Sequence, residues 1–108
     1  MKARMGIHER NREGMTPLHI AAKSGYQRIS QLLLQNSANI NAQDNNGWTP
    51  LHYAIINDEI QLINYLIKKG ADLSVKDRWG ESIETMAKEK PEIQKILKAA
   101  QKKMNPGT

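Results

Sequence analysis

The hexapeptide Thr-Pro-Leu-His-Ile-Ala at residues 16–21 returns at a 33-residue offset as Thr-Pro-Leu-His-Tyr-Ala at residues 49–54. Each copy carries the signals that begin a helix, because a threonine oxygen accepts from free backbone N–H groups and proline suits the first turn. A glycine precedes each threonine by two residues, at Gly14 and Gly47, and it suits a turn with positive φ. The sequence therefore predicts a repeat protein.

A third copy is degraded. Gly80, Ser82 and Ala87 keep the 33-residue offset, but the proline and the leucine of the motif are replaced. The next apolar triad begins six residues after Ala87, against eight in the other copies, so we expect a shorter turn between the two helices. Pro91 should open the second helix, whose many lysines provide the solvated surface of a C-terminal cap.

The 33-residue period and the motif T-P-L-H-x-A resemble the ankyrin repeat, a β-turn followed by two antiparallel helices. The resemblance covers residues 11 to about 100 and implies an all-α solenoid of helix-turn-helix units, with repeats at about 11–43, 44–76 and 77–100. We therefore expect three segments: a basic, flexible lead-in at residues 1–13, the repeat domain at 14–100 and a polar tail at 101–108.

The second helix of each repeat has apolar residues at i, i+3 and i+4, which share one helix face and are expected to turn inward. These triads are Ile29, Leu32, Leu33; Leu62, Tyr65, Leu66; and Ile93, Ile96, Leu97. Gly25 and Asp58 stand between the helices of their repeats. Asn36 is expected to take the left-handed conformation in which the family usually has glycine.

The net charge of +5 is unevenly distributed. Residues 1–14 hold four basic and two acidic groups (+2), residues 15–87 six and seven (−1), and residues 88–108 six and two (+4). The repeat body is thus nearly neutral. Cysteine is absent, which excludes disulfides and thiolate metal sites, and no long apolar run or secretory signal is present, so an intracellular location is the default expectation.

Catalytic chemistry is not indicated. His19 and His52 are the motif histidines, for which the resemblance implies structural hydrogen bonds near the turn, and they lie on different repeats rather than at i, i+4 on one helix, as a shared zinc would require. No serine or threonine has a credible base, and no glycine loop would hold a phosphate. We expect no enzyme activity, no cofactor and no metal.

Binding of another protein is therefore the leading hypothesis. The resemblance implies a concave surface made by the β-turn tips and the first helices. Carried over position by position, the partner-binding residues are Arg12, Met15, Lys23, Asn46, Trp48, Ile56, Asn57, Arg78 and Trp79. The two tryptophans are expected at hairpin tips, where each either contacts a partner or packs on the neighbouring turn. Replacing Trp48 and Ile56 by alanine should weaken binding without unfolding.

Two other functions are compatible with the sequence. The basic termini suit electrostatic binding of nucleic acid or an anionic membrane, for which steep salt dependence would be diagnostic. Repeat one has the apolar composition of an internal repeat, so its N-terminal face is covered by the lead-in at 1–13, meets another chain, or continues into a longer protein. A self-assembling unit is thus the third hypothesis. For Asn41 we expect a turn hydrogen bond, although in animal proteins similar to this one such an asparagine can be hydroxylated.

Overall fold

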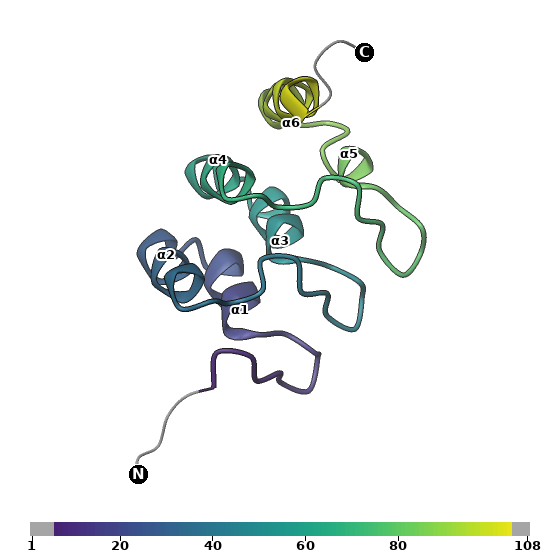
Figure 1. Cartoon of the computed structure of the whole chain (residues 1–108). Helices are drawn as coiled ribbons and strands as arrows, with labels where there is room; N and C mark the ends of the chain where they lie inside the picture. The colour runs from purple at the N-terminus through teal and green to yellow at the C-terminus, as the bar shows by residue number, and fades with distance from the viewer. Residues whose placement is uncertain (1–5, 105–108) are drawn as a thin grey trace.

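The computed structural model describes residues 6–104, and every regular element within that range is a helix. Six helices follow in chain order: α1 (Pro17–Lys23), α2 (Gln27–Gln35), α3 (Pro50–Ile56), α4 (Ile60–Lys68), α5 (Ile83–Met86) and α6 (Pro91–Met104). They form three antiparallel pairs, which confirms the expected all-α repeat architecture (Figure 1).

The three pairs stack in one direction. The first helices α1, α3 and α5 form one row, and α2, α4 and α6 form a second row behind it (Figure 1). Each first helix packs on the next, α1 on α3 and α3 on α5, and α4 contacts α6. Loops project from the opposite side of the first row. We call the loops at residues 10–15, 43–48 and 76–81 fingers one, two and three.

The first helices begin as the motif predicts. The Thr16 backbone N–H donates to His19 Nδ1 at 3.0 Å, and the Thr49 N–H donates to His52 Nδ1 at 2.9 Å. In the degraded third copy, the Ser82 hydroxyl accepts from the Thr85 N–H at 3.3 Å and is the N-cap. Thr16, Thr49 and Ser82 are thus the N-cap residues of the three first helices.

Residues with positive φ end the helices where the chain must reverse. Gly25 (φ 71°) and Asp58 (φ 57°) occupy the turns between the paired helices, as expected. The expectation for Asn36 is wrong: its φ is −104°, and the next residue, Ser37, takes the left-handed conformation at φ 73°. Ser37, and not Asn36, lies 33 residues before Gly70 (φ 97°) of the next repeat. Because the loop conformation repeats with the same period, the left-handed residue falls at Ser37.

The apolar core runs through repeats two and three. Leu62 and Leu66 of α4 and Ile93 and Leu97 of α6 are buried, and they pack in one cluster with Ile55 of α3. The remaining members of the two triads, Tyr65 and Ile96, are half-buried against that cluster. The helical periodicity thus identifies the buried faces of both second helices.

The prediction that the apolar triad of α2 turns inward is wrong for two of its three residues. Ile29 and Leu32 are each 46% exposed, and Leu33 is half-buried. The equivalent face of α4 is buried because repeat one stacks against it, whereas no helix pair precedes α2 in the described chain. The buried residue of α2 is Ser30, whose hydroxyl donates to the Tyr26 carbonyl at 2.9 Å.

Repeat three is shortened in its first helix, and the expected shorter turn is wrong: four residues separate α5 from α6, against three between the helices of each of the other two pairs. Helix α5 has four residues, and α6 opens at Pro91. The Lys90 ammonium lies 2.7 Å from the Ile55 carbonyl oxygen and 2.8 Å from Asp58 Oδ1, so it ties the third repeat to the end of α3. The four lysines of α6, Lys95, Lys98, Lys102 and Lys103, are exposed, which agrees with a solvated C-terminal cap.

The ends of the described chain extend the repeats. Residues 6–13 of the expected lead-in form turns and supply part of finger one, where the Asn11 N–H donates to the Met15 carbonyl at 2.9 Å. The first four residues of the expected tail, 101–104, continue α6. Residues 1–5 and 105–108 lie outside the described part of the chain.

Candidate functional site

The three fingers are joined side by side through their backbones. The Asn45 N–H donates to the Glu13 carbonyl at 3.0 Å, and one repeat later the Arg78 N–H donates to the Asn46 carbonyl at 2.9 Å. The Asn45 side-chain amide adds a bond of 3.1 Å to the Arg12 carbonyl. These bonds place the finger tips in a row and hold the surface between the fingers and the first helices in one shape.

Each finger is shaped by one acidic or amide side chain. Asp44 Oδ1 accepts from the backbone N–H groups of Asn46 and Trp48, both at 2.9 Å. Asp77 repeats these bonds in finger three, and Asn11 supplies the same pair in finger one. Asp44 and Asp77 are therefore turn residues. The role of Asn11 was missed, although its position one full period before Asp44 could have revealed it.

A cavity of about 360 Å³ opens between fingers one and two and the ends of α1 and α3. We call it the concave cavity. Six of the nine predicted contact residues line it together with Glu13 and Tyr53: Met15, Lys23, Asn46, Trp48, Ile56 and Asn57. Residues from two repeats thus converge on one hollow.

The lining residues divide into an apolar part and a polar rim. Met15 is 4% exposed and belongs to the core cluster, so its side chain is not the free contact that its position suggested. Ile56 remains 38% exposed. On the rim, the Asn57 amide donates to the Lys23 carbonyl at 2.7 Å and joins the ends of α3 and α1.

Trp48 lies at the base of finger two, after the turn, rather than at its tip. Its indole Nε1–H donates to Asp77 Oδ2 at 3.2 Å, and its ring stacks on His52 at 6.5 Å between centroids. The Tyr53 ring meets the same indole edge-on at 5.5 Å. Trp48 therefore connects repeats two and three while one part of it lines the concave cavity.

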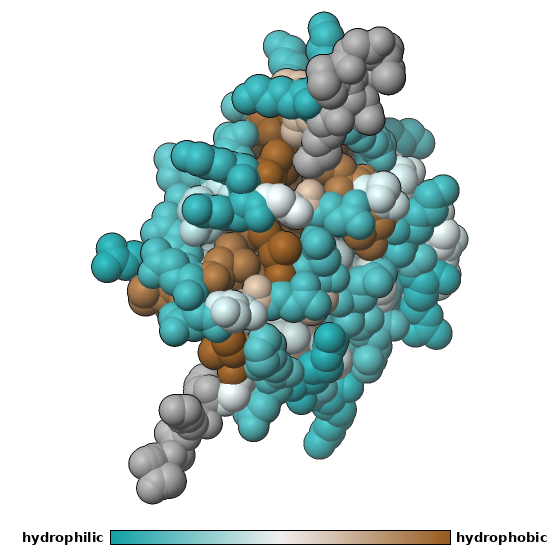
Figure 2. Space-filling model, in the orientation of Figure 1, coloured by the Kyte–Doolittle hydropathy of each residue, from teal (hydrophilic) through white to brown (hydrophobic). Residues whose placement is uncertain are grey.

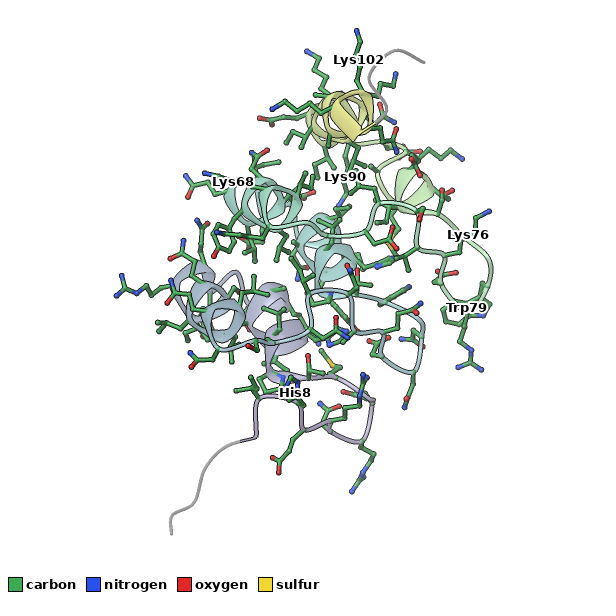
Figure 3. The ribbon with its side chains drawn as sticks, in the orientation of Figure 1. His8, Lys68, Lys76, Trp79, Lys90 and Lys102 are labelled. Atoms are coloured by element: carbon green, nitrogen blue, oxygen red, sulfur yellow. The ribbon has the colours of Figure 1, made fainter. Side chains whose placement is uncertain are left out.

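Trp79 occupies the tip of finger three and is 61% exposed (Figure 3). Its ring centroid lies 6.4 Å from that of Trp48, and the Arg78 guanidinium lies 5.3 Å from its centroid. Trp79, Arg78 and Arg12 do not line the concave cavity. They are exposed residues of the finger row beside it.

The two motif histidines have the structural role implied by the resemblance. His19 Nε2 lies 2.7 Å from the Trp48 carbonyl oxygen and bonds repeat one to repeat two. Burial lowers the pKa of His19, and it lowers the pKa of His52 to about 4, so both rings are neutral near pH 7. His52 Nε2 has no hydrogen-bond partner among the described residues.

Other sequence-derived candidates have structural partners. Asn41 Oδ1 accepts from the Asp72 N–H at 2.8 Å, which is the turn hydrogen bond considered for it. Within residues 6–104, no group of three or more His, Asp or Glu side chains is arranged to hold a metal ion. None of the helices in that range combines the length and the apolarity needed to cross a bilayer.

Two further surfaces lie outside the nine predicted contact residues. The first is the apolar surface of repeat one, where four side chains are exposed: Ile20, Tyr26, Ile29 and Leu32. The second is a cavity of about 710 Å³ between α4 and α6. The uncapped apolar composition of repeat one signalled the first surface, whereas the sequence carried no signal for the second, because it depends on the distance between two helices.

Comparison with known proteins agrees with this geometry. The family profile describing ankyrin repeats in three copies matches residues 2–77, well over half of the chain. Over 36 residues, 33% of this chain, the sequence is 53% identical to Rabankyrin-5 of Mus musculus and equally so to Rabankyrin-5 of Homo sapiens. That match spans 3% of the length of these relatives. The period, the paired helices and the finger row agree with the profile, and the chain belongs to the ankyrin repeat family.

Proposed function

We propose that the chain is a non-catalytic binding module that holds another protein against its concave cavity and finger tips. Ankyrin repeats generally mediate protein–protein interactions, and proteins built from them are commonly intracellular, which is the setting we propose here. The observation that carries the proposal is the convergence of contact positions from two repeats on one cavity, where Lys23, Asn46, Trp48, Ile56 and Asn57 line it above the buried Met15. Its walls are fixed by hydrogen bonds between fingers, so little order is lost on binding.

The chemistry of the surface defines the partner segment. Ile56 and the exposed part of Trp48 offer apolar area beside the polar side chains of Lys23 and Asn57. Trp79 adds a large exposed aromatic ring at the neighbouring tip, the residue type most often found as an interface hot spot. The complementary segment would place one apolar side chain in the concave cavity and polar groups around it.

The test is affinity capture from cells of the source organism, in which three versions of the chain are compared. The concave variant Ile56→Ser with Trp79→Ser removes exposed apolar area and leaves the Trp48–Asp77 bond in place. The control Ile29→Ser with Leu32→Ser removes similar area from repeat one. We expect specific proteins to be lost with the concave variant and retained with the control. Identical protein sets from the wild type and the concave variant would contradict the proposal.

Trp48→Ala is a poor probe of binding on its own. The sequence suggested that its removal would leave folding intact, but the indole bonds Asp77 and packs on His52 and Tyr53. We therefore expect Trp48→Ala to lower stability as well as to alter the concave cavity. Melting temperatures measured beside the capture experiment separate these effects.

Self-association through repeat one is a second candidate, favoured by its exposed apolar side chains. In repeat two the positions equivalent to Ile20 and Ile29 are Tyr53 and Leu62; both are buried, and the Tyr53 ring meets His19 of repeat one edge-on. The exposed positions thus have the composition of a stacking surface. Sedimentation velocity should show concentration-dependent dimers that Ile29→Ser with Leu32→Ser abolishes. A monomer at millimolar concentration would exclude this candidate.

A further inference from the structure

A groove lies on the back of the molecule, between the second helices of repeats two and three. It has a volume of about 710 Å³, and we call it the α4–α6 groove. Its apolar lining comes from Ile67 of α4 and from Ile96, Ala99 and Ala100 of α6. Figure 2 shows hydrophobic surface between the positions of these helices, with hydrophilic residues around it.

Small residues leave this space open. The side chains of Ala99 and Ala100 end at Cβ. At these two positions, α6 therefore lacks the longer side chains that would fill the space between it and α4. Ile67 and Ile96 are half-buried, Ala100 is buried and Ala99 is exposed, and lysines of both helices line the same groove. The result is a recessed apolar floor rather than a protruding apolar ridge.

The rim of the groove is positively charged. Lys68, Lys95 and Lys103 line it and are exposed, and Figure 3 shows Lys68 extending from α4. Helix α4 contains no acidic residue, and α6 contains only Glu92, in its first turn. Among the described residues, the ion pair found joins Lys90 to another segment, so no described carboxylate neutralises the rim.

We propose that the α4–α6 groove binds an acidic amphipathic helix of another protein. Apolar residues at i, i+3 and i+4 of such a helix would lie on the floor, and its carboxylates would meet the lysines on both sides. From Lys95 to Lys103 the rim extends about 12 Å along α6, so it would contact about two turns of the bound helix. This site is separate from the concave cavity and does not depend on its function.

A helix fits the groove better than the other anionic macromolecules. A bilayer surface is flat, whereas the groove is a hollow between two helices and suits a narrow, rod-shaped partner. Nucleic acid has phosphates for the lysines but no aliphatic side chains for the floor, and the lining contains no aromatic side chain on which a base would stack. An amphipathic helix supplies both the aliphatic and the negatively charged groups.

The probe is a fluorescein-labelled synthetic helix of about 16 residues, with leucines at i, i+3, i+4 and i+7 and glutamates on the flanking faces. Fluorescence polarisation should show saturable binding to the full chain. A peptide with lysines in place of the glutamates, and one with serines in place of the leucines, should each bind much more weakly. Failure of the wild-type chain to bind the acidic peptide saturably would overturn the proposal.

Matched charge variants locate the site. Lys95→Glu with Lys103→Glu reverses two rim charges, whereas Lys98→Glu with Lys102→Glu makes the same change at lysines of α6 that do not line the groove. We expect the rim variant to bind the acidic peptide at least about tenfold more weakly. The control should stay near wild type, and circular dichroism should show both folded. If the two variants weakened binding equally, the peptide would be held by non-specific charge attraction, and the assignment of the site to the groove would be wrong.

Two further measurements test whether the peptide occupies the groove itself and whether the groove binds a membrane instead. Ala99→Phe places a ring in the groove without changing charge, so it should abolish peptide binding while the helical signal is kept. Phosphatidylserine vesicles test the membrane alternative. If vesicles bind with the same variant pattern and the acidic peptide does not bind, the groove is a lipid site and the proposal is wrong.

Discussion

The same histidine of the motif has two different environments in the two full repeats. His19 and His52 each accept from the backbone of their capping threonine. His19 also reaches the Trp48 carbonyl oxygen of the next repeat, whereas His52 Nε2 has no such partner among the described residues, beside the shortened third repeat. Burial without that bond lowers the pKa of His52 to about 4.

This pKa gives the stability of the fold a defined pH dependence. The unfolded chain binds a proton at His52 below pH 6.5, but the folded chain does so only near pH 4. The contribution of the neutral His52 to the free energy of unfolding is therefore fully present above pH 6.5. It is lost as the pH falls towards 4, by up to roughly 3 kcal/mol. Urea unfolding at several pH values should show this loss, and His52→Gln should reduce the slope. The exposed His8→Gln is the control. Parallel curves for wild type and His52→Gln would contradict the assignment.

At the scale of single elements, two helices with nearly the same pattern have different surroundings. Helices α2 and α4 both carry the i, i+3, i+4 triad, but Leu62 is buried while its counterpart Ile29 is exposed. Amphipathic periodicity shows which face of a helix is apolar, and stacking decides whether that face is covered. The short helix α5 is also held by a neighbouring element: Lys90, in the turn that follows α5, bonds to the end of α3.

Lys90 should contribute measurably to stability (Figure 3). Its ammonium bonds the Ile55 and Ile56 carbonyls at 2.7 and 3.1 Å, at the negative end of the α3 dipole, and pairs with Asp58 at 2.8 Å. We expect Lys90→Met to lower the free energy of unfolding by about 1–2 kcal/mol. The control Lys88→Met removes the same charge at an exposed position nearby and should have little effect in the same urea titration. Equal losses from both variants would show that only net charge matters.

The whole molecule is a short one-dimensional stack, in which each repeat gains stability from its neighbours. Repeat two has a neighbour on both sides, and the apolar cluster contains residues of its α3 and α4 together with those of α6. Within residues 6–104, repeat one has a helix pair on one side only, and the large side chains of α2 are partly exposed. Stability should therefore be lowest at α2 and highest in the middle of the stack.

Amide hydrogen exchange should reveal this gradient. We expect backbone amides of α3 and α4 to exchange most slowly, near the rate of global unfolding, and those of α2 to exchange faster, because local opening exposes little additional apolar area there. Measurement by mass spectrometry or NMR at neutral pH is sufficient. Uniform protection over α2 and α4 would indicate that repeat one is covered, for example in a dimer, and a dilution series would detect that.

Local chemistry and the 33-residue period were sufficient to predict the fold and part of the candidate site. Threonine, proline and histidine specify the helix starts, glycine and Asp58 specify the reversals, and the equal period places residues of neighbouring repeats side by side. Six contact residues consequently converge on one cavity as an ankyrin-type stack requires. These features depend on interactions within one repeat or between equivalent positions.

Only the tertiary structure decided which apolar faces are covered and how the tryptophans are used. The Trp48 indole bonds Asp77 of the next finger, so its role depends on the distance between two fingers. Ile29 is exposed because no pair precedes it in the described chain, and the α4–α6 groove exists because Ala99 and Ala100 face a helix at a particular separation. Burial is a property of pairs of surfaces, whereas a sequence pattern describes one surface at a time.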